Sequence, residues 1–258
     1  MLIEIISPAP ILNTSDFDFA FGGYNGNEIP LNSKKHPYCF EFVALKGMTF
    51  EVERVLKQTN GVLYQISTPS YPHPHLFIDS RFTHPTSSLR PTPSLPERET
   101  ILQTMIEKIG TPYVWGGNWS RGIPEMLSYY PPKGLIDNQT AILWALQGVD
   151  CSGLLFEATG GATPRNTGQL IHFGVSVKKK DPLQPLDMIL YPGHVVFVLD
   201  KQKTIESKFP FGVITRDLSD RLEEFNAERT WVEEWEKALD PQKYYTARRF
   251  ASHLFSKE

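Results

Sequence analysis

The sequence predicts an α+β protein built in two parts. Residues 1–85 alternate short apolar runs with turns rich in glycine, asparagine and proline, a pattern typical of short strands. Residues 86–96 are rich in proline and hydroxyl side chains, which favours a linker. Residues 97–258 begin with a helical pattern and continue into apolar strands, so we expect helices packed on an antiparallel sheet. The length of 258 residues agrees with two units, because one domain has roughly 100–200 residues.

In the first part we expect a small barrel made of five short strands. Cys39 lies between two aromatic residues in one of these strands, so it is interpreted as a packing residue. His73 and His75 are a weak candidate for a metal pair, because prolines interrupt them and zinc needs three or four protein ligands. The expected strands are Leu2–Ile6, Phe40–Leu45, Thr49–Leu56, Val62–Ser67 and Leu76–Ile78.

The pattern of residues 83–110 predicts the linker and the first helix of the second part. Residues 83–96 contain four prolines with serine and threonine between them, which indicates a semi-rigid connection. Ser94 and Glu97 have the spacing of a capping box, so a helix of about twelve residues is expected there. Its apolar face would end before Gly110 and would contain Ile101, Leu102, Met105, Ile106 and Ile109.

Composition excludes several classes of partner. The chain has 26 basic and 29 acidic residues, so we expect neither nucleic acid nor a membrane as its partner. No apolar run approaches the roughly 18 residues of a membrane span. The opening Leu2–Ile6 run contains an acidic residue and lacks a signal-peptide cleavage site, which favours a strand. Two cysteines are too few for a disulfide scaffold, and together these observations predict a cytoplasmic protein.

The second part is organised around Cys151. Cys151 follows Asp150 and precedes Ser152, Gly153 and an apolar run, a pattern that indicates the start of a helix. In the first helical turn the dipole and the unpaired N–H groups favour an anion, so we expect the thiol to ionise readily and act as a nucleophile. The alternative is that Cys151 is one more small packing residue under the helix.

A nucleophilic thiol needs a base and a group that orients the base. Of the seven histidines, four precede residue 85 and His253 follows the last expected strand, which leaves His172 and His194. His172 lies near an expected helix end, where a solvated histidine is common. His194 opens the expected strand at residues 194–199 after a Pro-Gly turn, where its ring is accessible at the edge of a sheet. We therefore favour His194 as the base.

Six blocks occur in a definite order between Ser94 and Phe250, and together they resemble the NlpC-type papain-like cysteine peptidases of bacteria. The resemblance implies a papain-like domain over residues 97–258 and an SH3-like β-barrel domain before it. It also implies hydrolysis of peptidoglycan stem peptides without a cofactor or metal. The blocks are Gly110-Thr111-Pro112-Tyr113-Val114-Trp115-Gly116-Gly117, Asp150-Cys151-Ser152-Gly153, Thr163-Pro164-Arg165-Asn166-Thr167, Leu183-Gln184-Pro185-Leu186-Asp187-Met188, Gly193-His194-Val195-Val196-Phe197-Val198 and Tyr245-Thr246-Ala247-Arg248-Arg249-Phe250.

The resemblance also assigns roles beyond the dyad of Cys151 and His194. Glu206, about a dozen residues after the histidine on the next antiparallel strand, would orient the imidazole; the alternative is a solvated strand carboxylate. Tyr113 would supply an oxyanion donor beside the backbone N–H of Cys151, and Trp115 would wall the nucleophile. Asp150 and Ser152 would bind the ammonium of an N-terminal L-alanine, with helix capping as the alternative for Asp150.

The chain departs from the family at two places. Leu186 stands where the family usually has glycine, and residues 118–148 form a long aromatic insertion with an expected helix at residues 140–146. The insertion either covers the substrate cleft or adds a packing layer. The pattern of residues 218–235 predicts a helix and a loop, and it indicates no catalytic or binding role.

The resemblance implies a cysteine endopeptidase that cleaves the γ-D-glutamyl–meso-diaminopimelate bond, with a stem peptide or muropeptide as substrate. A chain of this kind would take part in murein peptide recycling. An N-acetylmuramoyl-L-alanine amidase that uses the same dyad and a non-catalytic wall-fragment-binding protein are the alternatives.

Overall fold

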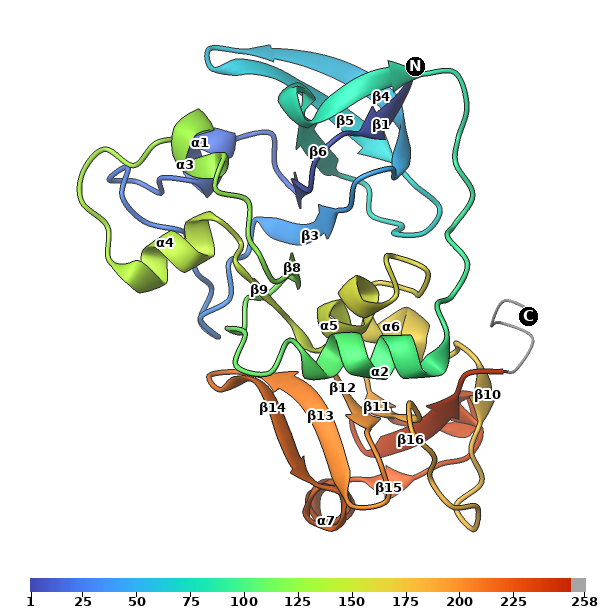
Figure 1. Ribbon diagram of the computed structural model, residues 1–258. Coiled ribbons are helices and arrows are strands. Elements are labelled where there is room, and N and C mark those ends of the chain that lie inside the picture. Colours follow the sequence, from blue (N-terminus) through green and yellow to red (C-terminus); the bar gives the residue numbers. More distant parts are fainter. Residues whose placement is uncertain (252–258) are drawn as a thin grey trace. The chain divides into compact units, whose positions relative to one another are not determined.

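The structure is a computed structural model that describes residues 1–251 (Figure 1). Its contacts divide the chain into two compact units, Met1–Pro91 with Val114–Val149, and Thr92–Tyr113 with the chain from Asp150 onward. The division between Pro91 and Thr92 falls within the linker expected at residues 86–96, whereas the return of Val114–Val149 to the first unit differs from the expected domains. His253 and the end of the domain expected over residues 97–258 lie outside the described residues.

The first unit contains a seven-stranded antiparallel sheet in the order β3-β2-β6-β5-β4-β1-β7. All five strands expected from the sequence are present, within two residues at each end. β2 and β7 were not expected, since each contains a proline, which argues against a strand in sequence reading. The SH3-like assignment stays a prediction. The strands are β1 (Leu2–Ile5), β2 (Ala9–Leu12), β3 (Phe40–Ala44), β4 (Thr49–Gln58), β5 (Gly61–Ser67), β6 (Leu76–Asp79) and β7 (Thr83–Thr86).

The insertion at residues 118–148 packs within the first unit. Its Trp144 and Tyr130 join the same apolar core as Phe17 and Phe21. The fully buried Asp79 carboxylate accepts a hydrogen bond of 2.7 Å from the Tyr130 hydroxyl. The insertion is therefore a packing layer of this unit, one of the two roles that the sequence left open. The remaining elements are α1 (Phe17–Ala20), η1 (Ser80–Phe82), β8 (Asn118–Trp119), α3 (Met126–Tyr129), α4 (Asn138–Trp144) and β9 (Gly148–Val149).

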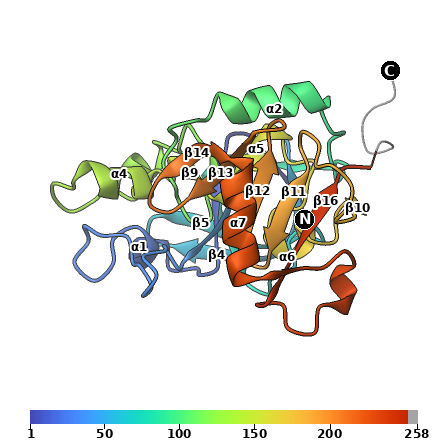
Figure 2. The same ribbon diagram turned by 90° about the horizontal axis from the view of Figure 1, so that it is seen from below.

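The second unit is an antiparallel sheet in the order β10-β16-β11-β12-β13-β14, with β15 added parallel to β16. Figure 1 and Figure 2 show α2 and α5 on one face of this sheet and α7 on the other. The predicted α+β class is thus confirmed. The helices are α2 (Arg98–Ile106), α5 (Cys151–Ala158), α6 (Thr167–Leu170), α7 (Leu218–Glu228) and η2 (Trp235–Lys237). The strands are β10 (Val175–Ser176), β11 (Met188–Tyr191), β12 (His194–Val198), β13 (Lys203–Lys208), β14 (Gly212–Asp217), β15 (Thr230–Trp231) and β16 (Tyr244–Arg249).

The expected capping box at Ser94 is wrong. α2 begins at Arg98, and Glu97 occupies the N-cap position without a side-chain cap hydrogen bond. A helix capped by Ser94 would need Leu95 in the helical region, which is disfavoured because Leu95 precedes Pro96. Beyond the end of α2, the Lys108 ammonium forms a 3.1 Å ion pair with the Glu157 carboxylate of α5, and this pair ties the two helices together.

Among residues 1–251, no helix is long and apolar enough to cross a membrane. α7, with 11 residues, has about half the roughly 20 that a span requires.

The turn before β11 contains the first departure from the family pattern. Leu186 has a φ of 72°, in the left-handed region that glycine adopts readily, and its side chain is fully buried. The next residue, Asp187, is also fully buried and accepts hydrogen bonds of 2.7 and 2.6 Å from the Arg249 guanidinium. The turn is therefore fixed by an ion pair and by the burial of Leu186.

Gly212 positions the segment that leads to Tyr113. The backbone of Val213 donates to the Thr111 carbonyl and accepts from the Gly110 amide, both at 2.9 Å. Gly212 has a φ of +74°, and a Cβ built on it would lie 2.2 Å from the Thr111 carbonyl oxygen. Only glycine allows the two backbones to approach this closely.

We therefore predict that Gly212→Ala lowers the free energy of unfolding by about 2 kcal/mol or more, because it adds a backbone clash to backbone strain. Gly160→Ala is the matched control: Gly160 also has a positive φ, +59°, but no atom lies within 4 Å of its added Cβ. The control should cost about 1 kcal/mol. Urea denaturation of both variants measures the difference, and equal losses would contradict the proposed clash.

Candidate active site

Cys151 is the first residue of α5, as the sequence predicts. Asp150 is the N-cap, and its Oδ1 accepts a 2.7 Å hydrogen bond from the Gly153 amide. At this end of a helix the first backbone N–H groups have no partner within the helix. The N–H of Cys151 can therefore donate to an oxyanion that forms beside the sulfur.

The Cys151 sulfur lies against the backbone at the start of β12. The thiol donates to the Gly193 carbonyl oxygen at 3.9 Å, and the Val195 N–H is directed at the sulfur from the other side. Gly193 and Val195 flank His194 in the sequence. The nucleophile candidate and the base candidate thus come from α5 and β12 and meet at one end of the sheet.

Burial governs the protonation of the thiol. It raises the pKa of Cys151 to about 12, and the nearby Asp150 charge adds to this effect. The Val195 and Ser152 N–H groups and the Arg165 charge act in the opposite direction but are outweighed. The expectation of a readily ionised thiol is therefore wrong for the unliganded protein, because desolvation of a buried anion exceeds the stabilisation available at a helix start.

His194 is held by Glu206. The His194 Nε2 lies 2.6 Å from the Glu206 Oε2, and the carboxylate is fully buried. Burial alone would raise the pKa of Glu206, but the hydrogen bond and charge of His194, together with Arg221, lower it overall. An ionised carboxylate can only accept, so the hydrogen lies on Nε2 and the lone pair of neutral His194 lies on Nδ1. Glu206 has the geometry of an orienting group, and the solvated alternative does not apply.

Arg221 of α7 is the second partner of Glu206. Its Nε lies 2.9 Å from Oε1, and its Nη2 donates to Oε2 at 3.1 Å. Arg221 is itself 5% exposed, and it also pairs with Glu224. A buried carboxylate needs this compensation, because an unpaired charge in the interior is costly. Residues 218–235, for which the sequence indicated no chemical role, thus contain an arginine that supports His194 through Glu206.

Asp150 and Ser152 are both bound to Arg165. The Arg165 guanidinium contacts the two Asp150 oxygens at 3.0 and 2.7 Å, and its Nη1 donates to the Ser152 hydroxyl at 3.0 Å. All three side chains are buried. Asp150 therefore acts as a helix cap and as the partner of a buried arginine, so the arrangement differs from the simple ammonium site expected from the sequence. A direct substrate role for Asp150 and Ser152 stays a prediction.

Tyr113 belongs to the second unit and lies near the nucleophile. Burial raises the pKa of its hydroxyl, and the charges of Asp150 and Cys151 contribute in the same direction, so the hydroxyl stays protonated and can donate. Its ring packs edge-on against Phe209, with centroids 6.1 Å apart. Trp115 belongs to the first unit, where it stacks on His36 at 4.2 Å and remains 37% exposed. Its role as a wall of the site stays a prediction.

The other histidines are engaged elsewhere. His172 forms a 3.2 Å pair with Glu236, and both side chains are more than half exposed. The His73 Nδ1 contacts the His75 carbonyl oxygen at 2.9 Å. The two histidines that the sequence offered as a weak candidate for a metal pair thus make a local contact within the chain. Within residues 1–251, no group of three or more histidine, cysteine, aspartate or glutamate side chains is arranged to hold a metal ion.

Two arginines of the site were missed in the sequence. Arg165 lies inside one of the recognised blocks, so its position beside an acidic motif was an available signal. No signal in the sequence indicated Arg221, because it lies 15 residues after Glu206 on a separate helix. Its role depends on the packing of α7.

Comparisons with known proteins identify a family match and a similar fold. Residues 110–230 match the model of the NlpC/P60 family, whereas no curated protein matches the chain. Among solved structures, the chain resembles an NlpC/P60 family protein from Bacillus cereus, with 14% identity, a TM-score of 0.55 and coverage of 97% of this chain and 99% of that one. This likeness concerns the fold.

Two proteins from Mycobacterium tuberculosis have lower TM-scores. The peptidoglycan hydrolase RipB has 21% identity and a TM-score of 0.37, over 62% of this chain and 65% of that chain. RipD, described as a non-catalytic NlpC/p60 domain protein adapted to peptidoglycan binding, has 21% identity and a TM-score of 0.33, over 47% of this chain and 87% of that one. Residues 110–230 of this chain therefore match the NlpC/P60 family, and the likeness to the Bacillus cereus protein shows the fold.

Proposed function

We propose that this protein is a cysteine endopeptidase that hydrolyses the γ-D-glutamyl–meso-diaminopimelate bond of peptidoglycan stem peptides. The observation that carries the proposal is the position of the Cys151 sulfur, 3.9 Å from the Gly193 carbonyl oxygen and in contact with the Val195 N–H, on either side of His194. The 2.6 Å contact between His194 and Glu206 adds the third member of a nucleophile–base–orienter set. The NlpC/P60 family match supports a substrate derived from peptidoglycan.

In the first step, the Cys151 sulfur attacks the carbonyl carbon of the scissile amide while His194 Nδ1 takes the thiol proton. Since burial raises the pKa of the Cys151 thiol, we expect this proton transfer to accompany the attack. The imidazolium that forms donates from Nε2 to Glu206, and the buried carboxylate stabilises its charge.

In the second step, the oxyanion accepts from the Cys151 N–H and the Tyr113 hydroxyl. The tetrahedral intermediate collapses to a thioester when His194 returns its proton to the leaving amine. Water, deprotonated by His194, then attacks the thioester, and the thiol and a free carboxylate are released. The step needs no cofactor, because the amide is hydrolysed without a change of oxidation state.

We predict that Cys151→Ala lowers hydrolysis of L-Ala-γ-D-Glu-meso-diaminopimelate by at least about a thousandfold, because no nucleophile remains. Mass spectrometry should detect free L-Ala-D-Glu with the native protein but not with Cys151→Ala. Cys39→Ala is the control, since Cys39 is a buried thiol of the first unit, and it should keep its activity. Release of an intact tripeptide from a muropeptide would favour the amidase, and turnover unchanged by Cys151→Ala would contradict the proposal.

We predict slow alkylation of Cys151 at neutral pH. In a Cys39→Ala background, the rate with iodoacetamide should rise about tenfold per pH unit between pH 7 and 10, because the thiolate fraction grows while the pH is below the raised pKa of the thiol. Quenched-flow alkylation followed by mass spectrometry measures this rate. A plateau between pH 5 and 8 would instead indicate a stable thiolate–imidazolium pair.

We predict that Glu206→Gln lowers kcat/KM by about a hundredfold or more, because an amide cannot stabilise the imidazolium by charge. Glu236→Gln, which changes the exposed His172 pair, is the matched control and should have no effect. Acid unfolding gives a second readout. The pKa of Glu206 is lowered by folding, so its contribution to stability is present above the ordinary glutamate pKa of about 4.3 and is lost as pH falls through the folded value.

The Glu206→Gln protein should lack this part of the acid dependence. An unfolding free energy that falls as steeply below pH 4 in the variant as in the native protein would show that Glu206 is not the responsible group.

A further inference from the structure

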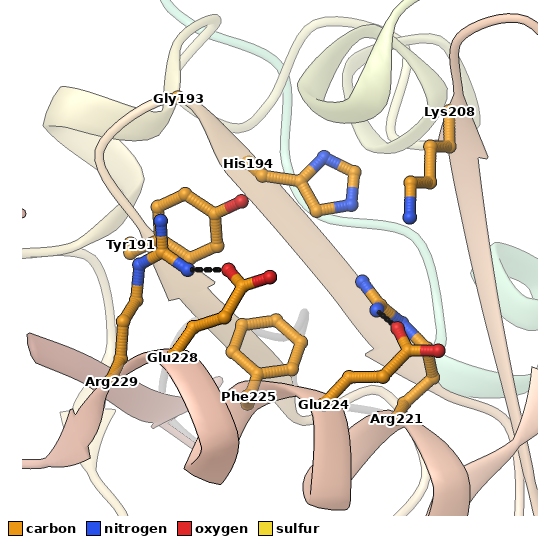
Figure 3. A pocket seen from close by; sticks show the side chains of 9 residues that line it. All are labelled: Tyr191, Gly193, His194, Lys208, Arg221, Glu224, Phe225, Glu228 and Arg229. Carbon is orange, nitrogen blue, oxygen red and sulfur yellow. Dashed lines mark hydrogen bonds and ion pairs between the residues drawn. The ribbon is translucent and has the colours of Figure 1, made fainter.

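A cavity of about 210 Å³ lies beside His194 in the second unit (Figure 3). It is bounded by the ends of β11, β12 and β13 and by α7. Its volume is below the roughly 300–1,000 Å³ of sites for drug-sized ligands, so it suits part of one amino acid. The mechanism described above uses His194 but leaves the space next to it without a role.

Most charges around the cavity are paired with one another. Arg221 pairs with Glu224, and the Arg229 guanidinium donates to the Glu228 carboxylate at 2.6 Å (Figure 3). Arg229 is also held over the Tyr191 ring, 3.6 Å from its centroid. Within each of these two ion pairs the opposite charges offset each other, and both pairs line the cavity with polar groups.

Lys208 is the remaining cation of the cavity wall. No ion pair or side-chain hydrogen bond of Lys208 is present among residues 1–251. β12 and β13 pair with Phe197 opposite Ile205 and Val198 opposite Thr204. This register, continued by three residues, brings Lys208 level with His194, and Figure 3 shows both side chains at the same end of the cavity. Among the described side chains that line the cavity, Lys208 is therefore the lysine or arginine outside an ion pair, and it lies next to His194.

We propose that this cavity binds a carboxylate of the amino acid that leaves during hydrolysis, and that Lys208 recognises it. The inference rests on the proposed function. His194 must give its proton to the leaving nitrogen, so this nitrogen lies beside the ring. The carbon attached to that nitrogen also bears the carboxylate of the leaving amino acid, which places an anion within reach of Lys208. An ammonium opposite this anion gives a charge-assisted hydrogen bond.

Diaminopimelate offers two sources for this anion, the carboxylate next to the leaving nitrogen and the one at its far end. Three substrates separate them: L-Ala-γ-D-Glu-meso-diaminopimelate, L-Ala-γ-D-Glu-L-Lys, and the C-terminal amide of the latter. The lysine acid keeps the near carboxylate only, and the amide has neither.

The test compares kcat/KM for the three substrates in the native protein and in Lys208→Met, which keeps the length of the side chain and removes its charge. We expect the native protein to prefer one or both acids over the amide by about tenfold or more. Lys208→Met should abolish this preference, so that the ratio of kcat/KM for acid and amide falls to about one. Loss of the preference for both acids identifies the near carboxylate, and loss for diaminopimelate alone identifies the far one.

Lys203→Met is the matched control, because Lys203 lies on the same strand but pairs with Asp217 at 2.9 Å. It should keep the native preference. The ratio of acid to amide cancels any general effect of Lys208 on Glu206, whose charge it also influences. A Lys208→Met protein that retains the native ratio would overturn the proposal.

Failure of the proposed function gives a different result, since the native protein would then cleave none of the three peptides. In that case calorimetry with free meso-diaminopimelate decides the matter. Binding that weakens at least about tenfold in Lys208→Met supports the carboxylate site, and binding that is absent or equal in both proteins overturns it.

Discussion

The second unit depends on one buried carboxylate. Glu206 is inaccessible to solvent, and it is ionised because two cationic or hydrogen-bonding side chains face it. β13 lies between β12 and the edge strand β14, so the residue is on an inner strand of the sheet. From there it holds His194 of β12 at 2.6 Å and Arg221 of α7 at 2.9 Å. Removing the carboxylate would leave the imidazole without orientation and would take from the buried Arg221 one of its two carboxylate partners, so folding and chemistry share this contact.

Much of this arrangement could be predicted from residue order. Alternating apolar residues identified the five strands of the first unit that were expected, and Cys151 was correctly placed at a helix start. The resemblance assigned Glu206, on the next antiparallel strand, as the group that orients His194, and the two side chains lie 2.6 Å apart. Arg221 could not be predicted, because its contact depends on how α7 packs on the sheet. The chain also returns to the first unit after Tyr113, which no local pattern signals.

The thiol of Cys151 illustrates the limit of local reasoning. A helix start favours an anion through partial charges close to the sulfur, and this effect is visible in the sequence. Desolvation depends on the atoms that the rest of the fold brings around the sulfur, and here it is the larger effect. Similarly, the resemblance assigned Asp150 to an ammonium group of the substrate, and its buried carboxylate holds Arg165 through a bidentate contact. In both cases a tertiary neighbour changed the electrostatics that the motif alone suggested.

The turn at Leu186 limits how this sequence can evolve. Glycine would relieve the left-handed backbone, a gain of about 1–2 kcal/mol. It would also remove a fully buried leucine side chain, and deletions of this kind cost about 2–5 kcal/mol. The single change Leu186→Gly is therefore unfavourable in this fold. Glycine becomes acceptable here only when a neighbouring side chain grows at the same time to fill the vacated space.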